Sequence, residues 1–201
     1  MPRVSRQQAE KNRAAIEEAS ARLIREQGIK GVSVADLMAA AGLTHGGFYG
    51  HFESKDALAA AACAKAFATS LERWRERTAS AADPAAALRV IVEAYLSPKA
   101  RDNAGGSCPA ASLAVDVARE PAGKPVHRSY VDGIHGLVDS LAALRGSGDE
   151  AADRERALVE LSLMVGALLM ARATAADPIS DQILEAARRH LLPVDDSVPT
   201  P

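Results

Sequence analysis

Residues 33–58 gather side chains that can bind phosphates and nucleobases. Thr44, His45, Tyr49, His51 and Lys55 fall within a short stretch of the chain. Hydroxyl, imidazole and phenol groups form hydrogen bonds with phosphate oxygens and base edges. A lysine in the first turn of a helix adds positive charge where free N–H groups already attract anions. This composition favours a surface that contacts nucleic acid.

The spacing around these side chains predicts two short helices joined by a tight turn. The first helix has its apolar residues at the i, i+3, i+4, i+7 positions of a one-faced helix: Val34, Leu37, Met38 and Ala41. Ser33 stands at its N-cap position, with Asp36 three residues later. Gly42 allows the left-handed conformation that ends a helix, and Thr44 is placed to cap the next one. Helices joined so tightly cross steeply, which projects the second helix into a DNA major groove.

The second short helix, about residues 45–51, is weak on propensity alone. Gly46, Gly47 and Gly50 each cost about 1 kcal/mol relative to alanine inside a helix, and propensity alone favours a loop. Glycine also lets a backbone approach a partner closely. Ser54 and Lys55 then open a long helix. The alternative is a surface helical hairpin that binds nothing.

The segment resembles the DNA-binding segment of the TetR family of bacterial transcriptional repressors. The matching residues, within about residues 10–60, are Gly28, Ser33, Val34, Leu37, Ala41, Gly42, Leu43, Gly46, Tyr49, His51, Phe52, Lys55 and Leu58. Gly47 and Gly50 depart from the family pattern, where a larger residue is more usual, which bears on the operator sequence. With the local pattern, the resemblance assigns DNA contact to Ser33, Thr44, His45, Gly46, Tyr49, His51 and Lys55.

The resemblance also implies the architecture. We expect an all-α chain of about nine helices with a three-helix head over residues 1–53. Residues 54–192 would form the ligand-binding and dimerisation domain, and residues 193–201 a disordered tail. Its function would be that of a ligand-responsive repressor that binds a palindromic operator as a dimer and is released by an inducer.

Composition agrees with packed helices. Hydrophobic residues make up 48% of the chain and aromatic residues only 3%, and much of the apolar content is alanine and leucine, which favour helix over sheet. The sequence has no run of eighteen apolar residues and no signal-peptide pattern at its N-terminus. We therefore expect a cytoplasmic protein with no membrane partner. No spacing of its residues predicts a cofactor or metal site.

Charge is unevenly distributed along the chain. Residues 1–80 contain twelve Lys and Arg against nine Asp and Glu, whereas residues 81–201 contain twelve against seventeen. A mildly basic N-terminal part on an acidic remainder is compatible with a protein that presents one end to DNA. An ordinary solvated surface could carry the same small charge.

Two C-terminal helices, about residues 150–175 and 178–192, are the predicted dimer interface. Small residues allow close approach of helices, and leucine and isoleucine supply apolar area for a four-helix bundle about a two-fold axis. The residues chosen for this interface are Leu161, Leu168, Leu169, Ile183, Leu184, Ala187 and Leu191. The alternative is that residues 150–175 form the central core helix of a monomer.

Outside the head, Cys108 is the residue whose position suggests chemical reactivity. Pro109 fits the first position of a helix, which places Cys108 at the N-cap. A thiol there feels the positive end of the helix dipole, so the residue is a candidate redox or electrophile sensor. The alternatives are a small packing cysteine and, less favoured, an enzyme that pairs Cys108 with His127 or His135 as base.

A ligand cavity is expected among the helices that follow the head. Its predicted lining combines apolar bulk with a few polar tips: Trp74, Tyr95, Cys108, Leu113, His127, Tyr130 and Met164. Few charges fall on the predicted inner faces, which favours a small, neutral, apolar inducer. Each of these residues can equally be ordinary core or surface.

Overall fold

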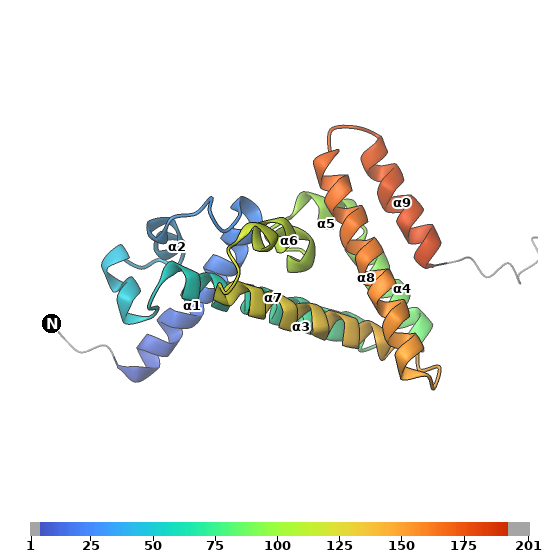
Figure 1. Cartoon of the computed structure of the whole chain (residues 1–201), viewed down its shortest axis with the longest axis horizontal. Coiled ribbons are helices and arrows are strands. Elements are labelled where there is room, and N and C mark those ends of the chain that lie inside the picture. The colour runs from blue at the N-terminus through green and yellow to red at the C-terminus, as the bar shows by residue number, and fades with distance from the viewer. Residues whose placement is uncertain (1–4, 193–201) are drawn as a thin grey trace, which may run out of the picture. The chain divides into compact units, whose positions relative to one another are not determined.

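The computed structural model describes residues 5–192, and these residues form helices without strands (Figure 1). The elements are α1 Arg6–Gln27, α2 Val34–Ala40, the 3-10 helix η1 His45–Gly50, α3 Lys55–Thr78, α4 Pro84–Tyr95, α5 Pro98–Asp102, α6 Pro109–Arg119, α7 Pro125–Ala142, α8 Glu150–Ala173 and α9 Ile179–Leu191. The predicted all-α class is confirmed. The predicted tail, residues 193–201, lies outside the described residues.

The chain divides into two compact units. Unit 1 contains the residues up to 71 together with 104–136, and unit 2 contains 72–103 together with the residues from 137 onward. Helices α3 and α7 each contribute residues to both units. The functional boundary predicted between residues 53 and 54 remains a prediction, because compactness groups part of α3, α6 and part of α7 with the N-terminal helices.

Unit 1 is built on α1. Ser5 caps this helix by accepting a hydrogen bond from the Gln8 backbone N–H at 3.2 Å. Ile16 and Ile24 are buried on its inner face, and α2 and α6 both pack against α1. Gly28 follows with a φ of +80° and a ψ of 161°, an extended positive-φ conformation that glycine adopts readily because it has no Cβ.

Residues 104–124 are tied to the same unit by polar contacts around α6. Arg25 donates a hydrogen bond to the Ser107 carbonyl at 2.8 Å. Two ion pairs join the loop after α6 to earlier elements: Lys30 with Glu120, and Lys124 with Asp56. The pairing with Asp56 raises the pKa of Lys124. These contacts hold α6 to the end of α1 and the first turn of α3.

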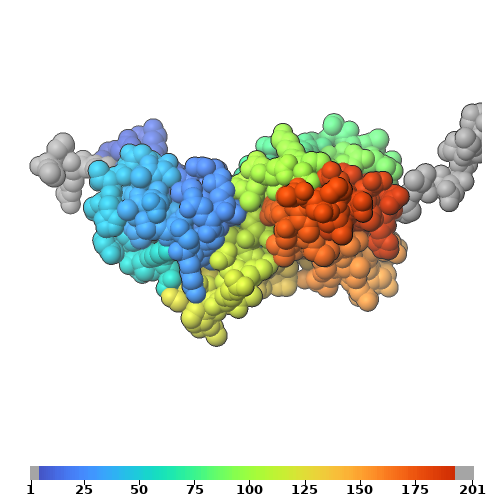
Figure 2. Space-filling model, turned by 90° about the horizontal axis from the view of Figure 1, so that it is seen from above, coloured from blue at the N-terminus to red at the C-terminus, as the bar shows by residue number. Residues whose placement is uncertain are grey.

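In unit 2, α8 packs against α9, α5 and α4. Figure 2 shows α9, in red, on the face turned toward the viewer. The buried side of α8 includes Ala157, Met164 and Ala171. Ser97 caps α5 by accepting from the Ala100 N–H at 3.1 Å. Among the described helices, none has the length and apolar character needed to cross a membrane.

Candidate DNA-binding surface

Helix α2 precedes residues 44–51, the segment expected to contact DNA (the recognition segment), and it has the predicted N-cap at Ser33. The Ser33 Oγ accepts from the Asp36 backbone N–H at 3.1 Å, and the Asp36 carboxylate accepts from the Ser33 backbone N–H at 2.9 Å. Both bonds of a capping box are therefore present. The hydrogen bonds from Ser33 lower the pKa of the Asp36 carboxyl. Gly42 has a φ of +71°, as its place between the two helices requires.

The second element of the motif is a 3-10 helix rather than an α-helix. The Gly47 N–H donates to the Thr44 carbonyl at 3.0 Å, and the His51 N–H donates to the Phe48 carbonyl at 2.9 Å, both of the i→i+3 type. Thr44 occupies the N-cap position, but its side chain makes no capping hydrogen bond. The predicted Thr44 cap is thus wrong in its chemistry, because the first turn is closed by backbone alone.

Phe48 anchors this short helix to unit 1. Its ring is buried, stacks on Phe52 with centroids 6.1 Å apart, and contacts the Tyr49 ring edge-on at 5.2 Å. Arg13 lies with its guanidinium carbon 4.3 Å from the Phe52 ring centroid and donates a hydrogen bond to the His51 carbonyl. A glycine-rich segment is therefore held in place by tertiary contacts rather than by helix propensity.

Arg13 was missed by the sequence reasoning. It belongs to α1, far from the recognition segment in sequence, and no spacing rule connects it with Phe52. Its ion pair with Glu17 at 3.0 Å gives it the sequence pattern of an ordinary i,i+4 surface pair. Only the tertiary structure reveals that the same side chain supports the end of η1.

All seven predicted DNA-contacting residues lie in unit 1. They occupy the N-cap of α2, the η1 segment with its flanking residues, and the first turn of α3. The Tyr49 side chain is the most open of them, at 76% exposed. Ser33, Thr44, His45 and Gly46 are also exposed, and His51 and Lys55 are half-buried. Their accessibility leaves them free to meet a partner, and contact with DNA remains a prediction.

Ser54 caps the long helix that follows. Its Oγ accepts from the Ala57 backbone N–H at 3.0 Å, which leaves Lys55 as the first residue of α3. Lys55 therefore stands where a helix dipole is positive and where a phosphate would find donors. This arrangement agrees with the expectation for residues 54 and 55.

Most of the predicted dimer-interface residues lie inside the protomer. The side chains buried in the core of unit 2 are Leu161, Leu168, Leu184, Ala187 and Leu191. They pack α8 and α9 within one chain, so they have no surface to offer a second copy. Leu169 is exposed and Ile183 is half-buried. Both helices are apolar on more than one side, so sequence periodicity does not separate the inner side from the outer one, and the place of a dimer interface remains a prediction.

The predicted ligand residues are divided between the two units. Trp74, Tyr95 and Met164 belong to unit 2, where the Trp74 and Tyr95 rings meet edge-on with centroids 6.4 Å apart. The members in unit 1 are Cys108, Leu113, His127 and Tyr130. Of these, Tyr130 donates to the Ala110 carbonyl at 2.9 Å and contacts the Phe67 ring at 5.5 Å. These contacts describe packing, and a ligand role for the set stays a prediction.

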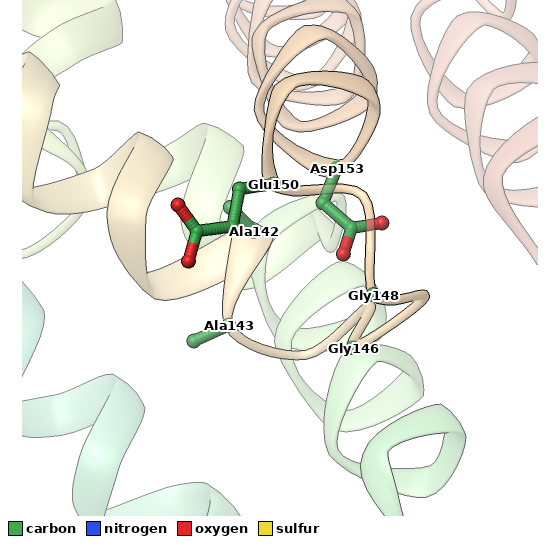
Figure 3. Close-up of a pocket in the computed structure, with 6 residues that line it drawn as sticks. All are labelled: Ala142, Ala143, Gly146, Gly148, Glu150 and Asp153. Carbon is green, nitrogen blue, oxygen red and sulfur yellow. The ribbon is translucent and has the colours of Figure 1, made fainter.

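A pocket of about 400 Å³ lies in unit 2 at the connection between α7 and α8 (Figure 3). Its lining consists of small residues and two carboxylates: Ala142, Ala143, Gly146, Gly148, Glu150 and Asp153. None of the predicted ligand residues lines it. Asp153 accepts a hydrogen bond from the Ser147 N–H at 2.9 Å, so part of its carboxylate is used by the loop itself.

Both cysteines are buried thiols. Burial raises the pKa of Cys63 to about 12, so this thiol is protonated at neutral pH. Cys108 is the N-cap residue of α6, as predicted. The His127 Nε2 lies 3.2 Å from the carbonyl oxygens of Glu120 and Pro121. Over residues 5–192, no three His, Cys, Asp or Glu side chains come together in a way that could hold a metal ion.

Comparison with known proteins places the recognition segment among regulators. Residues 16–62 match the family model described as bacterial regulatory proteins, tetR family. These residues include most of α1, all of α2 and η1, and the start of α3. No curated protein matches the chain.

Solved structures show the same fold over nearly the whole chain. A transcriptional regulator of the TetR family from Cytophaga hutchinsonii is 22% identical, covers 98% of this chain and 100% of its own, and has a TM-score of 0.78. The reduced form of NemR from E. coli is 21% identical, with 94% and 98% coverage and a TM-score of 0.75. A TetR regulator from Chloroflexus aurantiacus is 24% identical, with 92% and 94% coverage and a TM-score of 0.74.

Proposed function

The N-terminal segment of this chain is that of the tetR family of bacterial regulatory proteins, and on this premise we propose that the protein is a dimeric repressor that binds a palindromic DNA operator. An inducer would release it from the operator. A chromosomal operator would make the cytoplasm its place of action.

One observation carries the proposal. Helix α2, capped by Ser33 and followed by Gly42, leads into η1. This short helix buries the Phe48 ring and leaves Tyr49 and His45 exposed to solvent. An exposed imidazole at the first residue of η1 and an exposed phenol near its end can reach base edges and phosphates. Lys55, at the first turn of α3, would neutralise a phosphate beside them.

A second copy of the chain would be held through the outer face of α8. Val159 and Met170 are 62% and 54% exposed, and with Gly166 they follow i, i+7, i+11 spacing along one side of the helix. A Cβ added at Gly166 would meet nothing within 4 Å, so a partner helix could approach closely there. This proposal replaces the buried residues of the predicted interface with exposed ones and retains Leu169.

Release from DNA would depend on a small-molecule inducer. We expect a neutral, moderately apolar compound, since Trp74, Tyr95 and Met164 contribute apolar and aromatic surface to the inner side of unit 2. Helix α3 begins at Lys55 beside the recognition segment and continues to Thr78, and so offers a continuous element through which binding could shift the head. We propose no catalytic role, since the His127 Nε2 is already engaged by backbone carbonyls.

The experiment that tests the function is selection of bound duplexes from random DNA by the purified protein. Salt-dependent affinity is then measured on the enriched sequence. The proposal expects a palindrome and an affinity that falls steeply as salt rises, because released counterions drive phosphate binding. Failure to enrich any sequence by a folded, dimeric preparation would overturn it.

A thiol-based signal is the second candidate, supported by one specific position. Cys108 is a buried thiol at the N-cap of α6, and the similar NemR structure is described as a reduced form. Under this alternative, modification of Cys108 replaces inducer binding as the event that releases DNA.

Alkylation with N-ethylmaleimide separates the two candidates. The thiol-based proposal expects treated protein to lose operator affinity, Cys108→Ser to be resistant, and Cys63→Ser to remain sensitive. Equal loss in the Cys108→Ser variant, or no loss in the wild type, would remove Cys108 as the sensor.

A further inference from the structure

Three of the six residues of η1 are glycine, yet the fold does not require glycine at any of them. Among the described residues, the glycines with positive φ are Gly28, Gly42, Gly123, Gly146 and Gly148. Gly46, Gly47 and Gly50 are absent from that set, so alanine could adopt their backbone conformations. A left-handed turn therefore does not explain these residues.

Packing within the chain does not explain them either. A Cβ built on Gly46 or on Gly50 would meet no atom within 4 Å. A Cβ on Gly47 would meet the Met38 Cε at 3.7 Å, an ordinary van der Waals contact. Alanine at all three positions would fit the isolated protein, and glycine destabilises a helix relative to alanine. These three glycines therefore weaken η1, and no contact within the chain requires them.

The geometry of a 3-10 helix shows what surface these residues create. Side chains three residues apart lie on the same ridge. Phe48 is buried and holds its ridge against the protein, whereas His45, at the first position of the same ridge, is exposed. The second ridge carries Gly46 with Tyr49. The third ridge carries Gly47, whose Cβ would face Met38, and Gly50, whose Cβ would face open space. Tyr49 is consequently the one large side chain on these last two ridges, with the bare backbone of Gly46 and Gly50 beside it.

We infer that Gly46 and Gly50 form a surface without side chains on which the sugar–phosphate backbone of DNA lies directly against the main chain of η1. This inference rests on the proposed function and specifies how that site meets its partner. The exposed Tyr49 ring would stand beside the phosphates so accommodated. A Cβ at residue 46 or 50 would occupy space that the phosphodiester backbone needs, whereas one at residue 47 would point toward Met38.

The test compares Gly46→Ala and Gly50→Ala with Gly47→Ala, a control with the same change in helix propensity on the same element. Thermal unfolding and binding to the duplex selected by the wild type are measured for each. All three variants should melt at the wild-type temperature or about 2–4 °C above it, which also verifies that they fold. We expect the two test variants to bind at least roughly tenfold more weakly, a change of about 1.4 kcal/mol, and Gly47→Ala to bind as the wild type does.

Binding to a duplex of scrambled sequence distinguishes contact with the phosphodiester backbone from contact with the bases. Every duplex has the same phosphodiester backbone, so the two test variants should weaken on selected and scrambled DNA alike. Loss confined to the selected sequence would indicate base contact and overturn the inference. Equal binding by all three variants, equal weakening of all three, or tighter binding by the test variants would also overturn it. Failure of the wild type itself to bind DNA would instead count against the proposed function, and the inference would fall with it.

Discussion

The recognition segment η1 and the helix α8 use their residues in opposite ways. In η1 one ring, Phe48, is buried, and the remaining residues are glycine or exposed polar and aromatic groups. In α8 eight residues are buried against the rest of unit 2, and the exposed apolar ones form a separate side. Thus η1 buries a single side chain, whereas α8 buries eight of its 24 residues.

Under the proposed function, partner binding depends on η1 and stability depends on α8. The inner contacts of η1 come from other elements, through Phe52 and Arg13, so its outer surface can be changed without emptying a core. A buried leucine of α8 cannot be changed without leaving a cavity. Substitutions should therefore separate cleanly into those that affect DNA binding and those that affect folding.

Leu168→Ala should have the largest effect on stability. The side chain is fully buried, so its truncation should lower the free energy of unfolding by about 3 kcal/mol. Leu169→Ala is the matched control, because this neighbour is 37% exposed and should lose much less. Urea unfolding at one fixed protein concentration measures both. Equal losses would mean that the inner and outer sides of α8 have been misassigned.

Met170→Glu should weaken dimerisation through the outer side of the same helix. A carboxylate buried at an apolar interface loses its hydration, so the dissociation constant should rise at least roughly tenfold. Sedimentation across a range of protein concentrations measures it. Ala118→Glu places the same charge on the exposed surface of α6 and should leave the association unchanged. An unaltered Met170→Glu dimer would exclude this side of α8 as the interface.

Arg13→Ala should loosen η1 by removing its support. Loss of the contact with Phe52 and of the hydrogen bond to the His51 carbonyl should cost about 1–2 kcal/mol of unfolding free energy and weaken operator binding. Arg6→Ala serves as control, because it removes only an exposed ion pair with Glu10. If the two variants lose the same stability and affinity, Arg13 does not position the recognition segment.

The smallest change is expected at the capping box. Ser33→Ala should cost about 1 kcal/mol at neutral pH, the usual value of an N-cap. The pKa of Asp36 is lowered in the folded protein, so its contribution is present above the ordinary value of 3.8 and is lost as pH falls through the lower folded value. Asp36→Asn should therefore be less stable than the wild type at pH 7 and converge with it in acid. A pH-independent difference would contradict this account.

Local patterns predicted the parts of the fold that depend on near neighbours in sequence. The capping box at Ser33, the positive φ of Gly42 and the helix start at Pro109 all follow from residue type and spacing. The match of residues 16–62 to the tetR family model was predictable for the same reason, because its motif is contiguous.

What could not be predicted depends on contacts between distant residues. No spacing rule predicts Arg13 over the Phe52 ring. The inner and outer sides of α8 are similarly apolar in sequence. For this reason the predicted interface included Leu161 and Leu168, which are buried within the chain. The 3-10 form of η1 reflects three glycines held by tertiary packing, a balance that propensity alone could not resolve.

Contact between DNA and the outer surface of η1 is tested by Tyr49→Ala, measured by fluorescence anisotropy on the duplex that the wild type selects, with urea unfolding alongside. The side chain is 76% exposed, so the variant should unfold as the wild type does. Its operator affinity should fall by roughly a hundredfold, a loss of about 2.7 kcal/mol. Wild-type affinity in this variant would show that the outer surface of η1 does not meet DNA.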